Sequence, residues 1–121
     1  MRILQNMHIH SKLSNCAGDD NTMETIVREA ESVGLELIGI SDHMDLPDPG
    51  RVELIASNFE ILKGIETDLR VLIGSEVSFL APGRPAMSPE EMERFDYIIA
   101  ATNHYHPVSY THLTLPTKRI V

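Results

Sequence analysis

The sequence is short of cysteine, aromatic side chains and positive charge. It has one cysteine and no tryptophan, and aromatic residues make up 5% of its 121 positions. A single cysteine excludes an internal disulfide framework, and aliphatic side chains must form most of the core. Ten Lys and Arg stand against 18 Asp and Glu, a formal net charge of −8. This balance argues against a nucleic-acid partner, because phosphate contacts require clustered basic residues.

Long apolar runs are also missing from the sequence. No stretch is long enough to span a bilayer, and the chain does not open with the charged and then apolar segments of a secretory signal. We therefore expect a cytoplasmic protein with no membrane partner. The chain is long enough for one modest domain but not for a complete α/β barrel, which takes roughly 250 residues.

Strand and helix patterns alternate along the chain, which is typical of βα units around a parallel sheet. Apolar runs predict four strands, at about residues 3–9, 35–40, 70–74 and 97–101. The third run leads to Glu76, and Val77, Phe79 and Leu80 extend it. Helical spacing of apolar residues predicts helices at 23–33 and 52–62, the second after a loop at 47–50. The segment Ser88-Pro89-Glu90-Glu91 has a capping serine, a proline and a glutamate at capping-box positions and predicts a short helix after Ser88. Asn21, with Glu24 three residues later, is the expected N-cap of the first helix.

Candidate metal ligands stand near the end of each predicted strand: His8, His10, His43, Glu76 and His104. Because the carboxyl ends of parallel strands meet at one rim of the sheet, these side chains should converge. His8 and His10 are two residues apart, so they point to the same face of an extended strand. One such pair is a weak signal, but its recurrence with other ligands favours a metal site. Imidazole with carboxylate suits Zn, Mn or Fe better than Ca or Mg.

The motifs that carry these ligands resemble those of the PHP family, the polymerase and histidinol phosphatase superfamily of metal-dependent phosphoesterases. The matching segments are Met7-His8-Ile9-His10-Ser11, Ile40-Ser41-Asp42-His43, Gly74-Ser75-Glu76-Val77 and Ala101-Thr102-Asn103-His104. The resemblance covers residues 1 to about 107. It implies an α/β fold that forms the N-terminal part, about four βα units, of a distorted seven-stranded β/α (TIM-like) barrel.

The resemblance also implies how the ligands are shared among two or three divalent ions in the complete protein. His8, His10 and Glu76 would hold one ion. Glu76 and His104 would contribute to a second ion, and His43 to a third. Cys16 stands where family members commonly have a His or Asp ligand for the third ion. A thiolate could bind zinc there, and a buried, inert cysteine is equally compatible with the sequence.

The reaction implied by the resemblance is hydrolysis of a small phosphorylated substrate, as in histidinol phosphatases. Clustered cations would lower the pKa of a water molecule and neutralise the leaving alkoxide. Asp42 is expected to orient an imidazole, and a solvated surface carboxylate is the alternative. Arg84 and Lys12 could each meet the substrate phosphate, although isolated basic loop residues are usually just solvated.

Two other interpretations stay open. Amidohydrolases also carry a His-x-His pair at the end of the first barrel strand, although Glu76 in the third-strand position favours the PHP interpretation. The third interpretation is that the 121-residue product is a non-catalytic, truncated metal-binding fragment. The family's later Asp and His ligands come from strands beyond the fourth, and the sequence contains no counterpart of them.

The last residues do not continue the alternation of strands and helices. Residues 108–117 can be read as the translation of gtctcttatacacatctgacgctgccgacg, which resembles a transposon adapter used to prepare sequencing libraries. We therefore expect a partial PHP domain at 1–107 and a non-native, adapter-derived tail at 108–121. Without that tail eight basic and 18 acidic residues remain, and the net charge is about −10.

Overall fold

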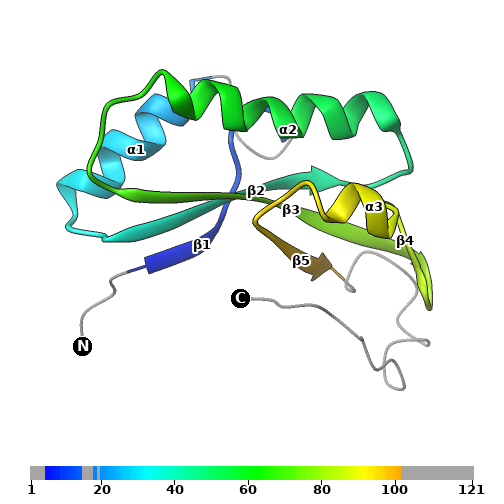
Figure 1. The fold of residues 1–121 in the computed structure, drawn as a ribbon. Coiled ribbons are helices and arrows are strands. Elements are labelled where there is room, and N and C mark those ends of the chain that lie inside the picture. The colour runs from blue at the N-terminus through cyan, green and yellow to red at the C-terminus, as the bar shows by residue number, and fades with distance from the viewer. Residues whose placement is uncertain (1–4, 15–17, 19, 102–121) are drawn as a thin grey trace.

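The computed structural model describes residues 5–14, 18 and 20–101, and it has a curled sheet with helices against one face (Figure 1). The elements are β1 (Gln5–Ile9), α1 (Met23–Ser32), β2 (Leu37–Met44), α2 (Pro49–Lys63), β3 (Arg70–Ala81), β4 (Arg84–Pro85), α3 (Pro89–Met92) and β5 (Tyr97–Ala101). Strands β1, β2, β3 and β5 are parallel neighbours in that order, and the short β4 pairs with β3 in the antiparallel sense. The expected α/β class is confirmed, and the sheet forms part of a TIM-like barrel.

The four predicted strands are present, but β2 extends further than its apolar run indicates. Asp42 and His43 therefore lie within β2 rather than in the loop that follows it, and Glu76 lies within β3, as predicted. The β2–β3 ladder is continuous, and it pairs His43 directly with Glu76. Backbone hydrogen bonds of the sheet thus hold two candidate ligands at a fixed separation.

The prediction of Asn21 as the N-cap of α1 is wrong by one residue. Thr22 is the N-cap, and its hydroxyl accepts the backbone N–H of Thr25. Asn21 instead donates its side-chain amide to the carbonyl of His10, and its own carbonyl accepts the N–H of Lys12. Asn21 therefore holds the backbone beside a candidate ligand.

Helices α2 and α3 begin at capping side chains followed by proline. Asp48 caps α2, so that helix begins at Pro49, inside the predicted loop. Ser88 and Glu91 form the capping box predicted for α3. Among the described residues, no helix combines the length and the apolar character needed to cross a membrane.

The hydrophobic core lies between the sheet and helices α1 and α2. Ile38 and Ile40 of β2 and Ile73 of β3 are fully buried there against Val27 of α1 and Ile55 of α2. The core is mainly aliphatic, as the composition predicts. Because side chains alternate along a strand, the residues between these positions face the other side of the sheet.

Tyr97 lies across that other face of the sheet, from β5 towards β1. Its hydroxyl donates to the carbonyl of Met7 over 2.7 Å. A Cβ atom at Gly39 on β2 or Gly74 on β3 would collide with the Tyr97 ring, so both positions require glycine to make room for it. Burial raises the pKa of the Tyr97 hydroxyl well above its ordinary value, so this group remains a donor.

We expect Tyr97→Phe to lower the free energy of unfolding by about 1 kcal/mol, because the Met7 carbonyl loses its closest side-chain donor. The remaining side-chain donor is the Ser41 hydroxyl at 3.5 Å. The raised pKa also means that the wild type should lose stability above about pH 10, where the unfolded chain ionises first. The Tyr97→Phe variant should lose less stability over the same pH range. Urea unfolding at about pH 8 and about pH 10.5 measures both effects, and identical curves for the two proteins would contradict this account of Tyr97.

Candidate metal centre

Three of the predicted ligands meet on the face of the sheet opposite the helices. Glu76 Oε1 lies 2.9 Å from His8 Nε2 and 2.8 Å from His10 Nε2. One ligand atom from each of these three residues lies within 4.8 Å of the others. The His8 side chain is 50% exposed whereas that of Glu76 is 8% exposed, so the cluster opens to solvent on the β1 side.

His43 flanks this cluster from β2, which lies between β1 and β3. Its Nδ1 is 3.4 Å from Glu76 Oε1 and 3.8 Å from Asp45 Oδ1. The centres of the His43 and His10 rings are 4.2 Å apart. The structure thus brings together four of the predicted metal ligands, from three strand segments.

Glu76 carries the negative charge to which the neighbouring imidazoles are directed. Burial raises the pKa of its carboxyl group, but the hydrogen bond and charge of His8, together with His43 and His10, outweigh burial. The net result is a pKa below the ordinary value, so Glu76 is ionised at neutral pH. An ionised carboxylate beside imidazole nitrogens is the donor set that a divalent transition-metal ion requires.

Asp42 lies on the opposite side of β2 from His43 and is fully buried. Its carboxylate accepts hydrogen bonds from Ser11 N, Ser11 Oγ, Ser14 Oγ and Asn58 Nδ2, at 2.6 to 2.9 Å. None of these donors is an imidazole, so the role expected for Asp42 is not realised as a direct contact. The reason is strand geometry, because consecutive residues point to opposite faces.

Asn58 is a buried polar residue of this site that lies outside the four sequence motifs. It lies on α2 and is 1% exposed, and it donates to the Asp42 carboxylate. A signal was present, because Asn58 is three residues after Ile55 and four before Leu62, on the apolar side of the helix. A polar side chain in that stripe indicates a buried hydrogen-bond partner.

Two other predicted ligands, Cys16 and His104, lie outside the described residues. The second ion assigned to Glu76 and His104 and the thiolate role of Cys16 therefore stay predictions. Of the two basic residues considered for the substrate phosphate, Lys12 follows the first motif closely, and Arg84 lies in β4 and pairs with Ala81. Both basic side chains are exposed.

A hollow of about 300 Å³ adjoins the cluster, and it is lined by His43, Asp45, Leu46, Asp48 and Arg51. The Arg51 guanidinium donates through Nε and Nη2 to the carbonyl of His43, at 3.1 and 2.9 Å. The first turn of α2 is therefore joined to β2 at a candidate ligand. A molecule held in this hollow would lie beside His43.

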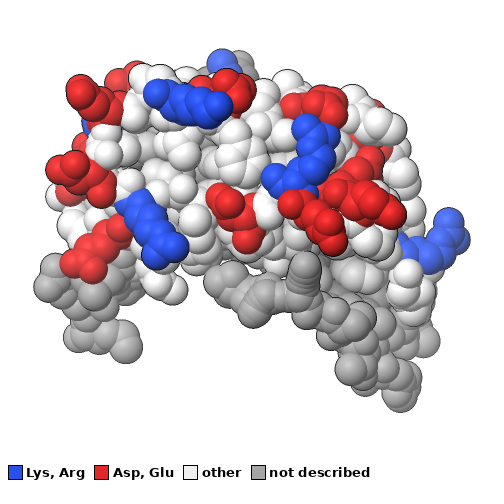
Figure 2. Space-filling model, viewed as in Figure 1, with Lys and Arg blue, Asp and Glu red and all other residues white. Residues whose placement is uncertain are grey.

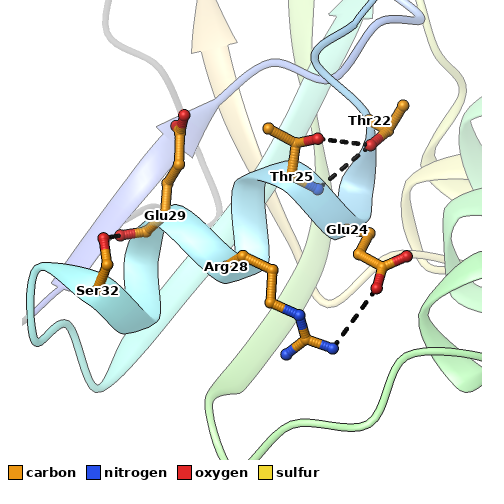
Figure 3. A pocket seen from close by; sticks show the side chains of 6 residues that line it. All are labelled: Thr22, Glu24, Thr25, Arg28, Glu29 and Ser32. Atoms are coloured by element: carbon orange, nitrogen blue, oxygen red, sulfur yellow. Dashed lines mark hydrogen bonds and ion pairs between the residues drawn. The ribbon is translucent and has the colours of Figure 1, made fainter.

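A second hollow, of about 450 Å³, runs along α1 and is lined by Thr22, Glu24, Thr25, Arg28, Glu29 and Ser32 (Figure 3). Most of its polar groups pair along the helix itself, and Arg28 also donates to the carbonyl of Glu66. Glu24 Oε2 lies 3.6 Å from Arg28 Nη2, and the Ser32 hydroxyl donates to the carbonyl of Glu29. None of the lining residues is a predicted ligand, so this hollow is helix surface rather than part of the metal centre.

Comparison with protein families matches residues 6–118 to the PHP domain. The matched range includes all four sequence motifs. It also runs over most of 108–121, the predicted adapter-derived tail, whose origin stays a prediction. Comparison with curated proteins gave no match.

Proposed function

Because the chain belongs to the PHP domain family, we propose that it is part of a metal-dependent phosphoesterase that hydrolyses a small phosphate ester, as histidinol phosphatases do. The observation that carries this proposal is the convergence of His8, His10 and Glu76 within 4.8 Å on one face of the sheet. The family match provides the reaction class, and the cluster provides the residues that would perform it.

The side chains present fit a divalent ion, with Zn, Mn or Fe favoured by the mixture of imidazole and carboxylate. An ion bound here would supply Lewis-acid activation of water and of the phosphoryl group. Glu76 provides the fixed negative charge, and the half-exposed His8 stands on the solvent side. Arg51 holds the backbone of His43 and so limits the positions that its imidazole can take.

The size of the hollow beside His43 favours a small substrate. Its volume of about 300 Å³ is at the lower end of the range for small-molecule sites. Figure 2 shows basic side chains dispersed among acidic ones on the face in view, with no continuous basic patch there. Both observations favour a small phosphorylated substrate over a nucleic-acid strand.

We further propose that the 121-residue chain has little or no turnover, because the ligands of the complete family barrel include residues from later strands. The test compares this chain with a longer protein read from the uninterrupted gene, each loaded with Mn²⁺ or Zn²⁺. We expect the longer protein to hydrolyse p-nitrophenyl phosphate. His8→Ala should lower its kcat by about 100-fold, because the cluster loses one imidazole ligand.

Each alternative interpretation has its own outcome in this assay. Hydrolysis of an amide substrate without phosphatase activity would identify an amidohydrolase-type enzyme. Robust phosphatase activity of the 121-residue chain that His8→Ala abolishes would contradict the proposal that the chain is an inactive fragment. Absence of phosphatase activity from both metal-loaded proteins would contradict the phosphoesterase proposal.

A further inference from the structure

Asp42 is in contact with the chain next to each of three candidate ligands. It precedes His43 in β2, and its carboxylate binds Ser11, which follows His10. Its backbone carbonyl accepts the hydroxyl of Ser75, which precedes Glu76. One residue on the helix side of the sheet is thus joined to all three segments that form the metal centre.

The carboxylate of Asp42 also closes a loop of hydrogen bonds back to its own strand. Oδ1 accepts the Ser14 hydroxyl over 2.8 Å, and Ser14 Oγ in turn accepts the backbone N–H of His43 over 3.0 Å. Oδ2 accepts the Asn58 amide over 2.9 Å, which adds α2 to the network. Residues 11–14, the segment after His10, are therefore held against β2, and the same carboxylate joins β2 to α2.

Stability does not explain why a carboxylate occupies this place. Within the described residues its donors are two serine hydroxyls, one amide side chain and one backbone N–H, and no Lys or Arg pairs with it. Burying a carboxyl group without a cationic partner is costly, and apolar residues of similar volume often serve a core at least as well. What a carboxylate offers here is the ability to accept four hydrogen bonds from separate segments at once.

We propose that Asp42 is a positioning residue whose carboxylate holds His10 and His43 in their metal-binding arrangement through Ser11 and Ser14. This role rests on the proposed metal-dependent function, because it assigns Asp42 to the same cluster. The effect passes through the backbone rather than through an imidazole. Asp42 and His43 can therefore face opposite sides of β2 and still act on the same site.

The test measures two properties of the 121-residue chain and its Asp42→Asn and Ser14→Ala variants. The first is the affinity for Zn²⁺ and Mn²⁺, measured by competition with a coloured chelator. The second is hydrogen exchange at the backbone N–H of His43 in the metal-free protein. We expect Asp42→Asn to weaken metal binding by about 10- to 100-fold and Ser14→Ala by about 10-fold. Exchange at His43 should accelerate in both variants.

Asp96→Asn is the matched control. Asp96 immediately precedes β5, and its carboxylate accepts the N–H of Ile73 of β3 over 2.8 Å. The variant therefore makes the same chemical change beside the same sheet, away from the cluster. It should keep metal affinity within about twofold of the wild type even if it unfolds more readily. An equal loss of affinity in Asp96→Asn would mean that affinity merely follows stability, and it would overturn the positioning role.

The remaining outcomes also decide between the two proposals. If Asp42→Asn does not fold, the better-tolerated Ser14→Ala decides the question. Wild-type affinity together with wild-type exchange in folded variants would overturn the positioning role. If the wild type binds neither metal ion, the metal centre assigned to this chain fails, whereas exchange at His43 still shows whether Asp42 and Ser14 hold the site.

Discussion

Glu76→Gln is expected to weaken the binding of Zn²⁺ or Mn²⁺ by about 100-fold or more, the largest effect of any single substitution in the cluster. Glu76 Oε1 is within 3.4 Å of nitrogens of His8, His10 and His43, so the same oxygen faces all three imidazoles. Glutamine keeps the size and one carbonyl oxygen but removes the negative charge. Calorimetric titration of the metal-free chain measures the change.

The control for Glu76→Gln is Glu60→Gln. Glu60 is exposed and pairs with Lys63 at 3.1 Å on the surface of α2, and exposed pairs of this kind contribute little to stability. This variant should bind metal as the wild type does. Circular dichroism should show that both variants are folded. Unchanged affinity in a folded Glu76→Gln protein would remove Glu76 from the metal centre and with it the main support for the proposed chemistry.

Gly74→Ala is expected to lower the free energy of unfolding by about 3 kcal/mol, at the upper end of the usual effect of overpacking. A Cβ atom at this position would lie 2.5 Å from the backbone oxygen of Tyr97 and 2.8 Å from its ring. Gly74 and Tyr97 are paired in the β3–β5 ladder, so neither strand can move aside without losing hydrogen bonds. Urea unfolding of the variant and the wild type measures the loss.

The control for Gly74→Ala is Gly64→Ala at the end of α2. Its new Cβ atom would have its nearest neighbour at 3.5 Å, an ordinary contact, and the backbone φ of −88° is compatible with any L residue. This variant should differ from the wild type by less than about 1 kcal/mol. If Gly74→Ala proved equally harmless, Tyr97 would not occupy the position over β3 that the structure assigns to it.

The cluster was predictable because its signals are local. His8 and His10 share a face through the two-residue period of a strand, and β3 brings Glu76 to the same side of a parallel sheet. The capping box at Ser88 and Glu91 was equally visible, since it depends on residues three apart. Arrangements of this kind need only the neighbouring sequence and the sheet order.

The contacts of Asp42 and Tyr97 were not predictable in this way. Asp42 stands beside a candidate ligand in the chain, and its sequence position suggested a contact with an imidazole. The register of β2 turns it towards α2, where Asn58 reaches it from a different element. Tyr97 read simply as the first residue of a strand, yet it reaches Met7 across β2 and β3.

Residue types and their spacing were sufficient to predict the α/β class, the four parallel strands and the convergence of imidazole and carboxylate side chains on one face of the sheet. These properties follow from the periodicity of apolar residues and from the chemistry of the ligand side chains, both of which can be read from the sequence. The folded arrangement alone revealed which face Asp42 serves, why Gly39 and Gly74 are required and how three segments are tied together. Such features depend on the side chains that distant elements bring into contact, and packing rather than local pattern selects them.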